Sequence, residues 1–148
     1  MHRRLSAACV ALIALAVAGC AGSARTATDY RLKARNSAKA ALSAVETSTL
    51  AARLVRERRA FSTYVSVVLD SAERDVTAVE STFSSIQPPG PSSDQLRSAL
   101  GNVLNDAADT ISSMRIASRR DARHDLLAAA DKLPKLQSDL QHYSDLPA

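Results

Sequence analysis

Apolar and polar residues follow one another with helical spacing over most of this chain. Residues 29–86 contain neither glycine nor proline, and residues that favour helices are frequent there. Small or apolar residues recur every three or four positions and predict one buried helix face. This first stripe consists of Tyr30, Ala34, Ala38, Ala41, Val45, Ala52 and Val55. The charged run at residues 56–59 predicts a helix end near Arg59, and Thr28 or Asp29 is the expected cap at its start.

A second helix is predicted after a turn at residues 61–63, and its pattern is the clearest in the chain. The apolar positions keep steps of three and four, as in a coiled-coil seam. They are Val65, Val68, Leu69, Ala72, Val76, Val79, Phe83 and Ile86. Three prolines within residues 88–91 end this helix, because proline cannot continue the backbone hydrogen bonding.

Two further helices are predicted beyond the prolines. Ser92 and Gln95 have the spacing of a capping box, and the stripe that follows is Leu96, Leu100, Val103, Ala107, Ile111 and Met114. A turn is expected at residues 118–121, where Asp121 would cap the fourth helix. Its inward positions are Leu126, Ala130, Leu133, Leu136 or Gln137, Leu140 and Tyr143. Pro134 predicts a kink or a restart at residues 132–134.

The predicted fold class is all-α. Four amphipathic segments joined by short turns fit an up-down-up-down antiparallel four-helix bundle, which would occupy residues 29–148. The chain has only five aromatic residues and no tryptophan, so alanine, valine and leucine should build the core. We expect a monomer, because the apolar faces can all be buried within one chain.

Residues 1–19 have a different character from the rest. Arg3 and Arg4 precede an apolar stretch at residues 5–17, and small residues follow, which is the organisation of a secretory signal. The apolar stretch of roughly 15 residues is shorter than the ~20 needed to span a bilayer. A cleaved signal is therefore favoured over the alternative of a permanent anchor.

The signal ends in Val17-Ala18-Gly19-Cys20, which resembles the lipobox of bacterial lipoproteins. The resemblance implies cleavage just before Cys20, a diacylglyceryl thioether on its sulfur, and usually acylation of the new N-terminus by a fatty acid such as palmitate. It further implies a location on the extracytoplasmic face of the cell membrane, with residues 20–28 as a lipidated tether. Together with the helical pattern, the chain resembles the small helical lipoproteins of actinobacteria.

The charge of the mature chain is smaller than that of the whole sequence. Two of the 19 basic residues leave with the signal, so 17 basic residues face 15 acidic ones, a net charge of +2. An exported domain with so little net charge is not expected to bind nucleic acid. Cys9 would be removed with the signal and Cys20 would carry the lipid, so no disulfide is expected.

No catalytic, cofactor or metal site is predicted. His124 and His142 are the only histidines after the signal, and neither has a second ligand at metal-binding spacing. The preferred function is a non-catalytic interaction or structural module of the cell envelope. The alternative is a helical bundle that binds a small molecule or an ion, either as a binding protein or as an enzyme. This alternative predicts a cavity lined by buried charges.

Arginines are concentrated where the first and third helices end and the fourth begins. An antiparallel bundle would bring these ends to one pole, away from the membrane. The residues are Arg56, Arg58, Arg59, Arg115, Arg119, Arg120 and Arg123. Arginine near a helix C-terminus complements the helix dipole, which explains such a cluster without any partner. The functional alternative is a surface for an anionic envelope polymer or an acidic protein, since guanidinium binds phosphate and carboxylate bidentately.

Overall fold

The computed structural model describes residues 24–147, and within this range it contains five α-helices and no strand. The all-α prediction is confirmed. The predicted signal peptide and the lipobox with Cys20 lie outside the described residues. The helices are α2 (Ala27–Arg56), α3 (Ser62–Ser85), α4 (Pro91–Arg119), α5 (Arg123–Ala130) and α6 (Leu133–Ser144).

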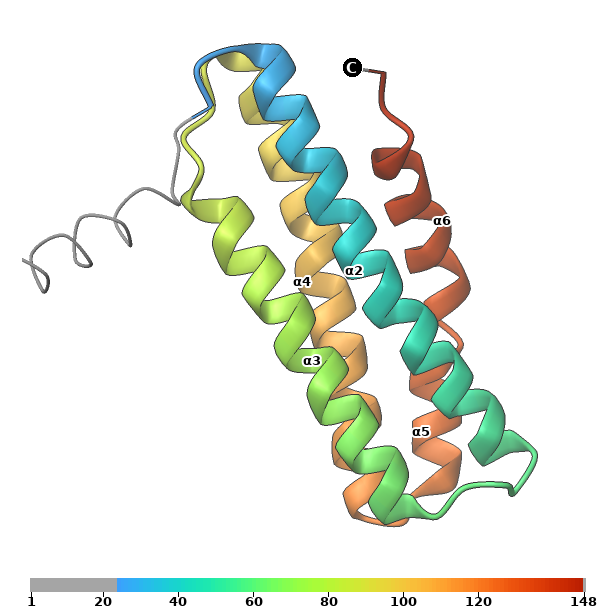
Figure 1. Cartoon of the computed structure of the whole chain (residues 1–148). Helices are drawn as coiled ribbons and strands as arrows, with labels where there is room; N and C mark the ends of the chain where they lie inside the picture. The colour runs from blue at the N-terminus through green and yellow to red at the C-terminus, as the bar shows by residue number, and fades with distance from the viewer. Residues whose placement is uncertain (1–23, 148) are drawn as a thin grey trace, which may run out of the picture.

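The helices pack as a bundle of four segments, in which α5 and α6 together form the fourth (Figure 1). α2 and α4 pack against each other, and each also packs against α3 and against the fourth segment. α3 packs mainly against α2 and α4. In Figure 1 the beginning of α2, the α3–α4 loop and the C-terminal residues lie at one end of the bundle. The α2–α3 loop and the α4–α5 turn lie at the other end.

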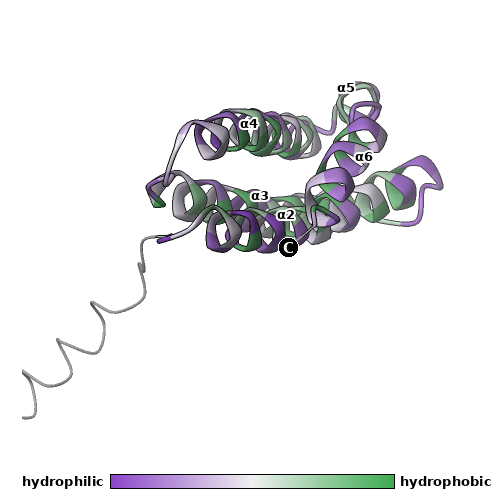
Figure 2. Cartoon of the chain, turned by 90° about the horizontal axis from the view of Figure 1, so that it is seen from above, coloured by the Kyte–Doolittle hydropathy of each residue, from purple (hydrophilic) through white to green (hydrophobic). Residues whose placement is uncertain are grey.

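The core is formed by the predicted stripes. Alanines of α2 (Ala34, Ala38 and Ala41) are fully buried, and so are larger stripe residues such as Leu69 and Leu100. Leu104 is also fully buried, although the predicted stripe contained its half-buried neighbour Val103 instead. Each helix carries both hydrophobic and hydrophilic residues, as amphipathic helices do (Figure 2). The buried polar residues of the described chain are four serines and one threonine, with no charged residue among them. Tyr30 and Phe83 fill the end of the core where α2 begins.

The fourth segment breaks where the proline predicts. Asp131 and Lys132 separate α5 from α6 but keep right-handed helical dihedral angles, with φ of −64° and −80°. Pro134 has no N–H to donate to the carbonyl of Ala130, so one helical hydrogen bond cannot form at this point. The prediction of a restart at residues 132–134 is confirmed, and the break is short.

Three predicted helix caps are wrong. The N-cap of α2 is Thr26, whose Oγ1 accepts a hydrogen bond from the Asp29 N–H at 3.1 Å. α4 begins at Pro91 with Gly90 as its N-cap, because proline has a φ suited to the first helical turn and lacks the N–H that would otherwise be unpaired there. Asp121 does not cap α5, since the N-cap of α5 is Ala122.

Candidate functional site

The end of α2 is closed by backbone hydrogen bonds that require a left-handed residue. The Arg58 N–H donates to the Val55 carbonyl at 3.1 Å and the Arg59 N–H to the Leu54 carbonyl at 2.9 Å. These two bonds form a Schellman motif, in which the left-handed position is usually glycine. Arg58 occupies this position with a φ of 54°.

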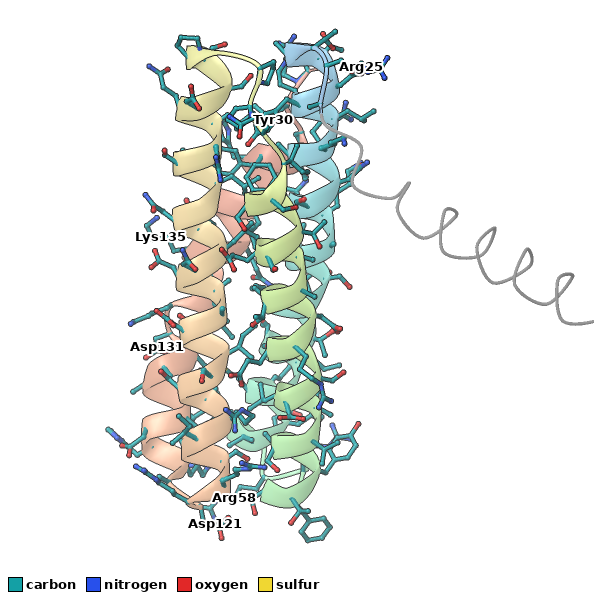
Figure 3. All side chains as sticks on the ribbon, turned by 90° about the vertical axis from the view of Figure 1, so that its left-hand side faces the viewer. Arg25, Tyr30, Arg58, Asp121, Asp131 and Lys135 are labelled. Carbon is teal, nitrogen blue, oxygen red and sulfur yellow. The ribbon has the colours of Figure 1, made fainter. Side chains whose placement is uncertain are left out.

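α4 ends in the same way. The Asp121 N–H donates to the Ser118 carbonyl at 3.1 Å, and the Ala122 N–H donates to the Ala117 carbonyl at 2.9 Å. Asp121 is left-handed, with a φ of 52°. Arg58 and Asp121 are the only non-glycine residues with positive φ in the described chain, and they lie at the same end of the bundle (Figure 3).

Replacing Arg58 with Gly is expected to raise the free energy of unfolding by about 1 kcal/mol. A non-glycine residue pays roughly this much for a left-handed backbone, whereas glycine adopts it without a steric cost. Urea unfolding followed by circular dichroism measures the change. Arg59→Gly is the matched control: Arg59 does not have a positive φ, so this change should give no gain. A loss of stability in Arg58→Gly would contradict the argument.

The predicted arginines do gather where the α2–α3 loop meets the α4–α5 turn, and we call this end of the bundle the arginine pole. Figure 2 shows the end of α2 and the loop after it as strongly hydrophilic. The pole comprises Arg56, Arg58, Arg59, Arg119, Arg120 and Arg123. The structure gives these side chains different roles, which the sequence did not distinguish.

Arg123 caps a helix that is distant in sequence. Its Nε donates to the Val55 carbonyl at 3.2 Å and its Nη2 to the Arg56 carbonyl at 3.1 Å. These are carbonyls of the last turn of α2, which carries the negative end of the helix dipole. For Arg123 the helix-capping explanation is therefore correct, and the contact also joins α5 to the end of α2.

Arg115 does not belong to the pole. Its guanidinium turns toward α3 and forms a bidentate ion pair with Glu73, from Nε to Oε2 and from Nη2 to Oε1, the latter at 3.3 Å. Its side chain is only 17% exposed, so it offers no surface to a partner. The inclusion of Arg115 in an exposed cluster is wrong, because its position on α4 faces the carboxylates of α3.

Arg56 and Arg59 have only exposed ionic partners. Arg56 lies 3.8 Å from a carboxylate oxygen of Asp131, and Arg59 lies 3.3 Å from Glu57. A hydrogen bond from Arg53, with a further one from Arg59, lowers the pKa of Glu57 below its ordinary value. Exposed pairs of this kind are worth little and exchange readily with other anions.

Three guanidinium groups of the pole form no ion pair. Arg58, Arg119 and Arg120 are exposed and have no ion pair with any described residue. α3 and α5 begin at the same pole, and neither N-terminus has a side-chain cap. Free backbone N–H groups at helix N-termini also favour anions. The pole is thus richer in unused donors than in unused acceptors.

A hollow of about 290 Å³ opens between the loop and the turn of this pole. Its apolar wall comes from Val55, Ala60, Ala117 and Leu126, and its polar groups come from Arg58, Ser62, Ser118, Asp121 and Arg123. The Ser118 hydroxyl donates to the Ser62 carbonyl at 2.9 Å and ties α4 to the start of α3. Sequence patterns did not predict this hollow, because it depends on how two connecting segments approach each other.

The other candidate chemistry is sparse. His124 lies beside Asp125 at 3.5 Å and is almost fully exposed, and His142 contacts the ring of Tyr143. The described residues contain no group of three or more histidine, cysteine, aspartate or glutamate side chains arranged to hold a metal ion. None of the described helices is both long and apolar enough to cross a membrane. Comparison with protein-family models, curated proteins and solved structures gives no match.

Proposed function

We propose that this chain is a lipid-anchored lipoprotein of the cell envelope whose helical domain is a non-catalytic interaction module. Cys20 carries the lipid after removal of residues 1–19, and the helices form an up-down-up-down antiparallel bundle on the extracytoplasmic face of the membrane. The lipobox resemblance supports the anchor. The helix contacts and the positions of the connecting segments in Figure 1 support the bundle topology.

The observation that carries the interaction role is the distribution of charge. The buried residues of the described chain are mostly apolar, and none of them is charged, whereas the alternative function predicts a cavity lined by buried charges. Three exposed guanidinium groups of the arginine pole, those of Arg58, Arg119 and Arg120, form no ion pair within the described chain. We propose an anionic envelope polymer or the acidic face of a protein as the partner, bound by a monomer of this chain.

The length of the first helix places this surface far from the anchor. α2 has 30 residues, which corresponds to about 45 Å at 1.5 Å per residue. The predicted tether ends where α2 begins at Ala27, two residues earlier than the sequence predicted, whereas the arginine pole lies at the end of α2. With the lipid in the membrane, the pole is directed toward the cell wall.

The proposal is tested with a cell fractionation and a binding measurement on the same set of variants. Cys20→Ala should move the protein from the membrane fraction to the soluble fraction, because the lipid chains supply the attachment. Wild-type mature protein that remained in the membrane with an unmodified Cys20, as determined by intact mass, would contradict the anchor.

Binding to isolated cell-wall material is compared across a salt series. Replacing Arg58, Arg59, Arg119 and Arg120 with Gln should weaken binding at low salt at least about tenfold, as expected from several exposed ionic contacts. It should also remove most of the salt dependence. The matched control replaces Arg25, Arg31, Arg35 and Lys39 with Gln, which removes the same charge near the other end of α2. Equal losses in both variants, or binding insensitive to salt, would contradict a role for the pole.

A further inference from the structure

The hollow at the arginine pole is lined by apolar residues and by two arginines, Arg58 and Arg123, and we infer that it binds a small organic anion. The ligand class is a carboxylate or a phosphate ester attached to an apolar group of a few carbon atoms. This inference rests on the proposed function, because the anion would be a terminal group of the envelope partner. It adds a defined site and a ligand chemistry that an exposed arginine surface does not specify.

The size of the hollow sets the size of the ligand. A volume of about 290 Å³ is near the lower end of the range of small-molecule sites. Water occupies about 30 Å³ per molecule in the liquid, so the hollow has room for roughly ten non-hydrogen atoms. A six-carbon acid or its phosphate counterpart is of this size, and a folded protein segment is not.

The two arginines of the hollow are prepared for an anion in different ways. Arg123 is held in position by its hydrogen bonds to the carbonyls of Val55 and Arg56, and its Nη1 has no acceptor among the described residues. Arg58 has no ion pair within the described chain and extends from the strained left-handed position at the end of α2. Asp121 also lines the hollow, so the three charged groups leave a net charge of +1 for a ligand.

The apolar wall selects against simple ions. Val55, Ala60, Ala117 and Leu126 provide no hydrogen bond to a ligand, but they can cover a hydrocarbon group and remove it from water. An anion without such a group uses the arginines only. An organic anion should therefore bind more tightly than acetate, and a neutral molecule with the same hydrocarbon group should bind less tightly than the anion.

The position of Arg58 also fits a binding role. Glycine would satisfy the left-handed backbone at this position at lower cost. Strained backbone is found preferentially where a side chain serves a ligand. Arg58→Gly should thus raise the free energy of unfolding and at the same time abolish ligand binding. Such a trade-off between stability and function is common at binding sites.

Ligand-observed saturation-transfer NMR on the purified full chain in detergent solution tests the inference. The probes are hexanoate and hexyl phosphate, with acetate and hexanamide as comparisons. Hexanamide also reports any transfer through the detergent, because it has a similar hydrocarbon group without the charge. We expect saturation transfer to hexanoate, hexyl phosphate or both, with much weaker transfer to the two comparison molecules. The preferred probe identifies the anionic group.

Three variants locate the site. Arg58→Gln should weaken binding about tenfold or more, as the loss of a charge-assisted contact predicts. Ala60→Leu should abolish binding by filling the hollow, while its thermal unfolding midpoint stays near that of the wild type. Arg119→Gln is the matched control, because Arg119 belongs to the same pole but does not line the hollow; it should change binding less than twofold.

The inference is overturned if neither probe shows transfer above hexanamide, if Arg58→Gln and Arg119→Gln weaken binding equally, or if Ala60→Leu binds normally. These outcomes are distinct from failure of the proposed function. Hexanoate binding that depends on Arg58, in a chain that shows no salt-dependent binding to cell-wall material, would overturn the proposed function alone. Wall binding by the pole without a response to either probe would overturn only the site described here.

Discussion

Replacing Phe83 with Ala is expected to lower the free energy of unfolding by about 3 to 5 kcal/mol, as is typical for a large buried aromatic side chain. Phe83 is 1% exposed and its ring packs against Tyr30 with a centroid distance of 5.6 Å. Many of the buried hydrophobic residues of the bundle are alanines and valines on its helices. These helices cannot close the cavity without losing their own contacts.

Phe61→Ala is the matched control, because the same side chain is removed from a position that is 88% exposed. It should change the free energy of unfolding by no more than about 0.5 kcal/mol. Urea unfolding of both variants gives the comparison, with the slope of the transition as a check that the unfolded state is unchanged. Similar losses in the two variants would show that Phe83 does not occupy a rigid core.

The core could be predicted from the sequence because it depends on periodicity alone. Every residue of the stripe from Tyr30 to Val55 and of the stripe from Val65 to Ile86 is buried or half-buried. The stripe of α2 missed three further buried residues, Ala44, Ser48 and Ala51. A helix repeats every 3.6 residues whatever its neighbours are, so one face can be identified without knowing what covers it. Pro134 was equally informative, since its missing N–H has the same consequence in any helix.

The helix ends were less predictable, because capping depends on backbone geometry as well as residue type. The pair of Ser92 and Gln95 has the spacing of a capping box, but the favourable φ of Pro91 starts the helix earlier. Similarly, α2 and α4 end with motifs that usually contain glycine, yet the left-handed residues are Arg58 and Asp121. No residue-type pattern marks these two positions.

The sequence predicted that arginines would be concentrated at these helix ends, but it did not predict which groups each arginine contacts. Arg123 of α5 contacts the end of α2, but the partner of each guanidinium depends on the register between helices. Arg123 reaches carbonyls 67 and 68 residues earlier in the chain, and Arg115 reaches Glu73 on a different helix. Contacts of this range have no signature in local sequence spacing.

The ion pair between Arg115 and Glu73 leads to the second large expected effect. Arg115→Met should lower the free energy of unfolding at pH 7 by about 1 to 3 kcal/mol, because it leaves a partly buried carboxylate without its main partner. Methionine keeps the length and apolar part of the side chain, so the change tests the charge and the hydrogen bonds. Arg120→Met removes an exposed arginine near the end of the same helix and should have little effect.

The pH dependence distinguishes the ion pair from a loss of packing. The hydrogen bond from Arg115, with smaller contributions from Ser112 and from the charges of Arg115 and Arg119, lowers the pKa of Glu73 below its ordinary value of 4.5, although burial opposes the shift. A carboxyl whose pKa is lowered by folding stabilises the protein above its unfolded pKa, and this contribution is lost as the pH falls through the folded pKa. In Arg115→Met burial remains, so the pKa of Glu73 should return toward or above 4.5.

The difference in free energy of unfolding between wild type and Arg115→Met should therefore be largest at neutral pH and should decrease as the pH falls below about 4.5. Urea unfolding at several pH values between 3 and 7 measures it. A difference that stays constant over this range would assign the effect to packing of the Arg115 side chain. A difference that shrinks in acid would show that ionised Glu73 stabilises the contact between α3 and α4 at this point, about one helical turn before Arg119 of the arginine pole.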